Sequence, residues 1–84
     1  MRWTIAELLR LPQDWDTYGS VPPTKAAGET AEKLLAQLPD ATEAYPISGG
    51  GLQLDFVLGE VEHMVEIGPG GEIVEAPDGM EFRL

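Results

Sequence analysis

The chain has 84 residues, of which 43% are hydrophobic and 24% charged, and 15 acidic residues against 5 basic ones give a formal net charge of −10. Domains usually need about 50 to 250 residues, so we expect residues 1–84 to form a single domain. The composition is globular, and the absence of cysteine excludes disulfide bonds, a thiol nucleophile and a cysteine-based zinc site. The negative charge repels nucleic acid phosphates and anionic membranes, so we predict direct binding to neither.

Nothing in the sequence predicts a membrane span or a secretory signal. No apolar run approaches the roughly 20 residues that cross a bilayer. Residues 1–7 lack the apolar stretch and small-residue cleavage site of a secretory signal, which predicts a cytoplasmic protein.

Helical spacing marks the N-terminal part, residues 1–39. Thr4-Ile5-Ala6-Glu7 fits a capping box, and the short helix that follows it is stopped by Pro12. A loop rich in turn formers comes next, and we predict that its aromatic residues Trp15 and Tyr18 pin it to the core.

The main helix is predicted from Pro23 or Thr24 to Leu38. One face is apolar, formed by Ala27, Ala31, Leu34, Leu35 and Leu38. Gly28 costs about 1 kcal/mol relative to alanine in a helix, which indicates close packing there or a weak start to the helix.

Residues 45–84 alternate with a period of two, which predicts an antiparallel sheet. Gly59-Glu60 is a two-residue turn with glycine first, the signature of type II′, and it fixes the register of the hairpin around it. One side of this hairpin is apolar apart from His63, with the pairs Leu58–Val61, Phe56–His63, Leu54–Val65 and Leu52–Ile67. The other side has the pairs Val57–Glu62, Asp55–Met64 and Gln53–Glu66.

The remaining strands are shorter. Gly68–Gly71 and Pro77–Gly79 are predicted turns that lead to strands over 72–76 and 80–84, and residues 45–48 add an edge strand in which Pro46 is tolerable. The sequence therefore predicts the α+β class, with two layers: a three- to five-stranded antiparallel β-meander packed on one main α-helix, with a short N-terminal helix.

The residues do not favour an enzyme. His63 is the only histidine, and a core or edge role opposite Phe56 is its simplest interpretation. Ser20 and Ser48 lack the setting of a serine nucleophile. Paired carboxylates for acid–base chemistry must face each other across a cleft. Asp14 and Asp16 instead fit a loop cap, and Glu62 and Glu66 fit a solvated sheet face. We predict no catalytic residues and no cofactor.

Metal and phosphate sites are also disfavoured. Asp14-x-Asp16 resembles the start of a calcium loop, but Tyr18 and Ser20 follow where ligands should stand and no glutamate occupies the twelfth position. The glycine-rich segments Ser48–Gly51 and Gly68–Gly71 are typical of turns, not of a phosphate-binding loop before a helix.

A surface is the remaining candidate. The polar side of the hairpin is acidic with two apolar residues in it, and it is either a solubilising face or a surface for a basic partner. Its residues are Gln53, Asp55, Val57, Glu62, Met64 and Glu66.

The run Asp14-Trp15-Asp16-Thr17-Tyr18-Gly19, the helix after Pro22-Pro23, and Gly50-Gly51-Leu52-Gln53-Leu54-Asp55 together carry a resemblance. Over most of residues 13–79 the chain is similar to a widespread family of small, uncharacterised bacterial and phage proteins. That family has a Trp-Asp-x-Tyr-Gly loop, a helix and a Gly-Gly-x-x-Leu-Glu-Trp strand, where this chain has Asp55-Phe56 in place of Glu-Trp.

The resemblance implies an accessory or mobile-element protein, in some cases from toxin–antitoxin or defence systems, and it brings no catalytic residues. It also implies that four loop residues form one unit, either a structural plug or part of a recognition surface: Trp15, Asp16, Tyr18 and Gly19.

These observations predict a non-enzymatic, acidic protein–protein interaction module, an inhibitor or antitoxin-like accessory protein that binds a basic or mixed protein partner. The sheet face or a free sheet edge would bind that partner, and the edge also offers a route to a homodimer. The alternative is a DNA mimic that blocks a nucleic-acid-binding enzyme, in the manner of a phage anti-defence protein.

Overall fold

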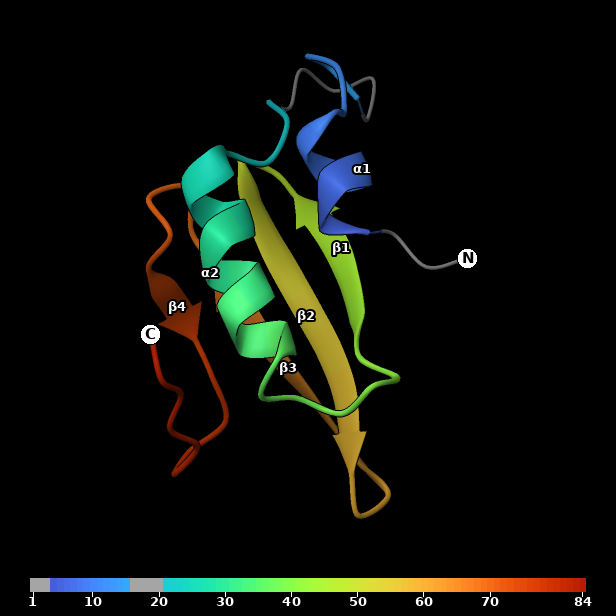
Figure 1. Cartoon of the computed structure of the whole chain (residues 1–84), viewed down its shortest axis with the longest axis vertical. Coiled ribbons are helices and arrows are strands. Elements are labelled where there is room, and N and C mark those ends of the chain that lie inside the picture. Colours follow the sequence, from blue (N-terminus) through green and yellow to red (C-terminus); the bar gives the residue numbers. More distant parts are fainter. Residues whose placement is uncertain (1–3, 16–20) are drawn as a thin grey trace.

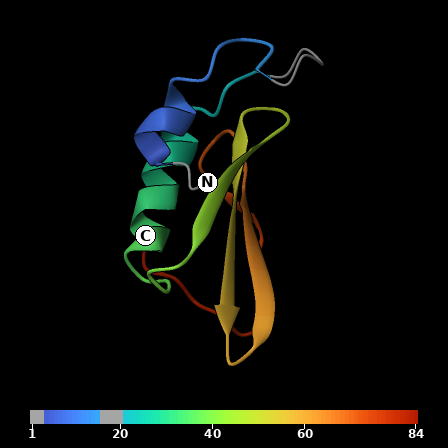
Figure 2. The same cartoon turned by 90° about the vertical axis from the view of Figure 1, so that its right-hand side faces the viewer.

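The computed structural model describes residues 4–15 and 21–84, and their elements confirm the α+β class. Two helices, α1 (Ile5–Leu9) and α2 (Lys25–Leu35), lie on one face of an open antiparallel sheet (Figures 1 and 2). The described strands follow the order β1-β2-β3-β4. Their bounds are Glu43–Ile47, Gly51–Leu58, Val61–Ile67 and Ile73–Glu75. In the described ranges, the helices are all too short or too polar to cross a membrane.

α1 begins with the predicted capping box. The Glu7 amide donates to Thr4 Oγ1 at 3.1 Å, and the Thr4 amide donates to Glu7 Oε1 at 2.9 Å. The bond from the Thr4 amide, followed by a hydrogen bond from the Thr4 side chain to the same carboxyl, holds the pKa of Glu7 below its usual value because both favour the charged form. The helix ends at Leu9, before Pro12, and it buries Ile5 and Leu8. An isolated helix of this length is unstable in water, so its docked apolar side maintains it.

α2 is shorter than predicted at both ends. Thr24 is the N-cap, and its hydroxyl accepts a hydrogen bond from the Ala27 amide at 3.1 Å. Beyond the C-cap Ala36 the chain continues to Leu38 through tighter i→i−3 bonds, from Gln37 N to Leu34 O and from Leu38 N to Leu35 O. Of the two alternatives that the sequence left open at Gly28, the structure shows close packing, because a Cβ there would lie 3.0 Å from both Leu9 δ-carbons.

The core lies between the helices and the sheet. Both helices, β1, β2 and β3 contribute to one buried apolar cluster, which therefore joins the two halves of the sequence. Its members are Ile5, Leu8, Ala27, Ala31, Leu34, Ala44, Leu52, Leu54, Phe56, Val65 and Ile67.

The β2–β3 hairpin has the predicted register at every pair from Leu52–Ile67 to Leu58–Val61. The predicted type II′ turn is wrong, however. Both central residues have positive φ, 56° at Gly59 and 71° at Glu60, which is typical of type I′. Both turn types have the twist of a two-residue hairpin, so the register is the same although Glu60 adopts a conformation that non-glycine residues rarely take.

The C-terminal prediction is wrong as well. Residues 80–84 alternate in hydropathy, but they form no strand and instead lie beside the end of α2. The Arg83 amide donates to Gln37 Oε1 at 2.8 Å, and Gln37 Nε2 donates to the Arg83 carbonyl at 2.7 Å. These bonds satisfy the backbone of Arg83 without a neighbouring strand, while Met80 and Phe82 pack against the core.

Both glycine-rich turns pack against α2. The Thr24 amide donates to the Gly50 carbonyl at 3.0 Å, and the Thr30 hydroxyl donates to the Gly71 carbonyl at 2.6 Å. A Cβ at Gly71, where φ is +85°, would lie 2.9 Å from the Ala26 carbonyl oxygen. These turns therefore set the position of α2 against the sheet.

Candidate functional site

The sheet face away from the helices collects all six residues that the sequence predicts as a partner-binding face. β1 and β4 extend it, because Glu43 lies opposite Asp55, Tyr45 opposite Gln53, and Glu75 opposite Glu66. We call this surface the outer face. It consists of Glu43, Tyr45, Gln53, Asp55, Val57, Glu62, Met64, Glu66 and Glu75.

The outer face carries five carboxylates and no base from the described residues. Two carboxylate pairs are direct cross-strand neighbours, Glu43 with Asp55 and Glu66 with Glu75. Like charges that face each other across two strands destabilise a sheet. The described basic residues lie elsewhere: Arg10 caps α1, Lys25 and Lys33 lie on α2, and Arg83 lies in the C-terminal segment.

Two hydrogen bonds organise the carboxylates at the β1 end. The Tyr45 hydroxyl donates to Glu43 Oε2, and Gln53 Nε2 donates to Asp55 Oδ1 at 2.8 Å. The bond to Glu43, followed by partial desolvation and the charges of Glu43 and Asp55, raises the pKa of Tyr45 above its usual value. Tyr45 thus remains a neutral hydroxyl that orients one carboxylate oxygen.

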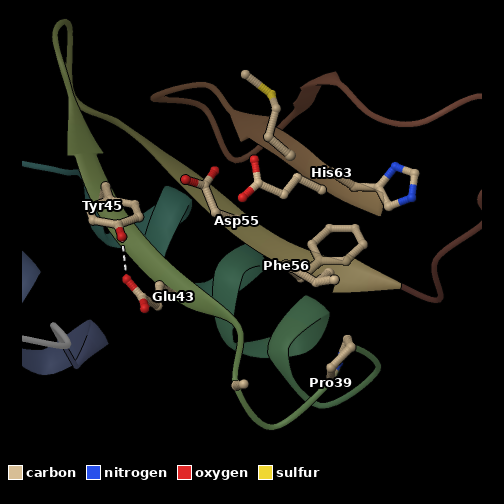
Figure 3. Close-up of a pocket in the computed structure, with 10 residues that line it drawn as sticks. Pro39, Glu43, Tyr45, Asp55, Phe56 and His63 are labelled. Atoms are coloured by element: carbon tan, nitrogen blue, oxygen red, sulfur yellow. Dashed lines mark hydrogen bonds between the residues drawn. The ribbon is translucent and has the colours of Figure 1, made fainter. Parts of the chain in front are cut away.

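A concavity lies beside this cluster, where β2 continues beyond the first residue of β1. β1 starts opposite Asp55, so Phe56, Val57 and Leu58 have no β1 partner, and the segment before β1 diverges from the sheet. We call this hollow the β2-edge pocket, and Figure 3 shows the side chains that line it. Its volume is about 510 Å³. Its lining is formed by Pro39, Ala41, Glu43, Tyr45, Asp55, Phe56, Val57, Glu62, His63 and Met64.

His63 lies at the inner side of this pocket. Its half-buried imidazole contacts Phe56, with ring centroids 5.6 Å apart, as expected for residues that are cross-strand partners. Across residues 4–15 and 21–84, no three histidine, aspartate or glutamate side chains gather as metal ligands would.

A second groove of 470 Å³ lies between the two helices. Its floor is formed by Ile5, Leu9 and Gly28, and charged side chains of α2 line its rim. The close approach of the helices at Gly28 explains this groove as a feature of helix packing.

The predicted loop unit is described only at Trp15. Its Nε1 donates to the Val21 carbonyl at 2.9 Å, which ties the two ends of the loop together. Asp16, Tyr18 and Gly19 lie outside the described residues.

Sequence reasoning missed Glu43, Tyr45 and Glu75 as members of the outer face. The hairpin residues could be placed because a tight turn fixes their register, whereas β1 and β4 are joined to it through glycine-rich turns whose geometry a pattern does not specify. The alternation of Glu43, Tyr45 and Ile47 could have found the two β1 residues. No such pattern points to Glu75, because the register of β4 shifts against β3.

Comparisons with protein-family models, curated proteins and solved structures find no match for this chain. The resemblance to the family with the Trp-Asp-x-Tyr-Gly loop therefore stays a prediction.

Proposed function

We propose that this chain is a non-enzymatic interaction module that binds a basic or mixed protein partner through the outer face. The observation that carries the proposal is that two like-charged pairs, Glu43–Asp55 and Glu66–Glu75, are cross-strand neighbours on that face, where no described base lies. A sheet under selection for stability alone would place opposite charges at such positions. Local rules are broken most often at functional sites, where a partner supplies the compensating charge.

The apolar residues on the same face support a protein partner. Val57 is 53% exposed, and Met64 and Tyr45 are half-buried among the carboxylates. Protein interfaces combine apolar and aromatic anchors with a charged surround, and methionine adapts to irregular surfaces.

The sheet edges are poorly suited to binding a partner by strand addition, which leaves the outer face as the better binding surface. β1 contains Pro46, which has no N–H to donate to an added strand. β4 has three residues, and its register shifts against β3 between Glu66 and Ile67. Short edge strands, prolines and bulges are the devices by which sheets avoid edge pairing.

The test is partner capture from host lysate by the tagged chain and by two charge-reversed variants. Asp55→Lys, Glu62→Lys and Glu66→Lys together should abolish capture of a stoichiometric partner while the circular dichroism spectrum is unchanged. The matched control, Glu29→Lys, Glu32→Lys and Glu81→Lys, makes the same change in charge away from the outer face and should retain capture. Equal capture by both variants would refute the proposal.

The second candidate is inhibition of a nucleic-acid-binding enzyme by mimicry of DNA, favoured by a face that carries five carboxylates without a described base. A mimic would compete with DNA for its target, and its affinity would fall steeply with salt. Val57→Ala with Met64→Ala separates the two candidates, because these truncations should weaken an interface with apolar anchors and leave a purely electrostatic mimic unaffected.

A further inference from the structure

The β2-edge pocket combines three kinds of surface that a cationic side chain needs. Glu43, Asp55 and Glu62 supply negative charge, Tyr45 supplies an aromatic ring, and Met64 supplies apolar surface for an aliphatic stem. Its 510 Å³ lies within the range of about 300–1,000 Å³ that is usual for ligand pockets.

Two carboxylates that line this pocket, Glu43 and Asp55, retain acceptor capacity. Glu43 Oε2 accepts a hydrogen bond from the Tyr45 hydroxyl, and Asp55 Oδ1 accepts one from Gln53 Nε2. Among the described residues, no donor bonds to Glu43 Oε1 or to Asp55 Oδ2. Glu43 and Asp55 are direct cross-strand neighbours. One planar donor is therefore large enough to bridge their two carboxylates.

We infer that the β2-edge pocket binds a guanidinium group, so that the partner engages this chain through an arginine side chain. The inference rests on the proposed function and names the chemistry of the partner's anchor. A guanidinium presents five N–H donors in a fixed plane, which suits two neighbouring carboxylates. A guanidinium is also more weakly hydrated than an ammonium, so it loses less on leaving water to lie beside Met64. It also stacks on aromatic rings, and Tyr45 supplies one.

The cation would also relieve the repulsion between two carboxylates that line the pocket. Glu43 and Asp55 repel each other across β1 and β2, and this cost is removed when one positive group lies between them. Arginine stems bury well along apolar surface while the charged head stays at a polar rim. Val57 and Met64 provide that surface next to the carboxylates.

The test is an NMR titration of the isotope-labelled full chain with N-acetyl-arginine amide at low salt. We expect saturable shifts confined to the amides that line the pocket. The citrulline analogue, which has the same shape without the charge, should produce none. The lysine analogue should bind several-fold more weakly, and calcium chloride should not reproduce the pattern.

Variants locate the site within the acidic surface. Glu43→Gln with Asp55→Asn should weaken arginine binding about tenfold, since it removes both charged acceptors, and it should leave the fold intact because it also removes a repulsive pair. Glu81→Gln, an exposed carboxylate outside the pocket, should change the affinity less than twofold.

Three outcomes overturn the inference: equal shifts with citrulline, shifts spread over every acidic residue, or unchanged affinity in the double variant. These results are distinguishable from failure of the proposed function. If partner capture still depends on the outer face but the chain does not bind arginine, only the inferred guanidinium site is overturned. Arginine binding in a chain whose partner capture ignores the outer face overturns only the proposed function.

Discussion

The two faces of the β2–β3 hairpin share one backbone, but one face is buried and the other is half-buried or exposed. On the face toward the helices, Leu52, Leu54, Val65 and Ile67 are each 0% exposed. On the outer face the alternate residues are half-buried or exposed, and carboxylates dominate among them. Period-two alternation creates both faces at once, so the difference between them is a difference in what covers them.

The helix-facing side also changes along its own length. Phe56 is 4% exposed, but Leu58 and Val61 near the turn are 41% and 55% exposed. Figures 1 and 2 show the hairpin tip extending beyond the end of α2. Apolar residues on the helix-facing side of the hairpin are therefore buried only as far along the strands as the helices extend.

The largest expected effect compares two leucines of β2 that point to the same side. Leu54→Ala should lower the free energy of unfolding by about 2–5 kcal/mol, because it leaves a cavity in a closed core. Leu58→Ala should cost less than about 1 kcal/mol, since water already reaches this side chain. Urea unfolding followed by circular dichroism measures both. Similar losses would mean that the tip is covered in solution.

A smaller effect tests the repulsion on the outer face. Glu75→Lys converts the Glu66–Glu75 pair into an attractive one, and it should raise the free energy of unfolding by about 0.5 kcal/mol at low salt. The gain should shrink as salt is added. Glu81→Lys makes the same change in net charge without a cross-strand partner. An equal gain in that control would assign the effect to net charge instead of to the pair.

The smallest effect concerns the ionisation of Tyr45. Its folded-state pKa lies above the ordinary value of 10.0, chiefly because of the hydrogen bond to Glu43. The stabilisation from this bond is therefore fully present below the unfolded-state pKa and is lost as the pH rises through the folded-state pKa. Absorbance titration of the Tyr18→Phe chain isolates this phenol. Adding Glu43→Gln should lower its pKa towards the ordinary value, and an identical titration curve would contradict the hydrogen bond.

The hairpin was the most predictable element, and the physical reason is local. A two-residue turn fixes which residues oppose each other, and a slip by one residue would move every leucine to the solvent side. The register is correct even though the turn type is wrong, because types I′ and II′ both match the strand twist. The six outer-face residues predicted from sequence therefore lie together.

Segments whose partners are distant in the sequence were harder to predict. Residues 80–84 alternate like a strand, yet Gln37 pairs with their backbone and no strand forms. β4 shortens to Ile73–Glu75, with an irregularity against β3, for which a pattern of alternation gives no sign. The contributions of Glu43 and Tyr45 to the β2-edge pocket likewise depend on where β1 starts against β2.

The sequence by itself determined the class of the fold, the hairpin register, the capping box of α1 and the acidic character of one sheet face. Each follows from interactions between residues close in the chain or from a period that a packed layer imposes. Only the tertiary structure decided where the helices stop covering the sheet, and which distant carboxylates become neighbours. Those outcomes depend on how two glycine-rich turns dock against α2, through contacts such as Thr30 with Gly71, and residues 41 positions apart leave no periodic trace in a sequence.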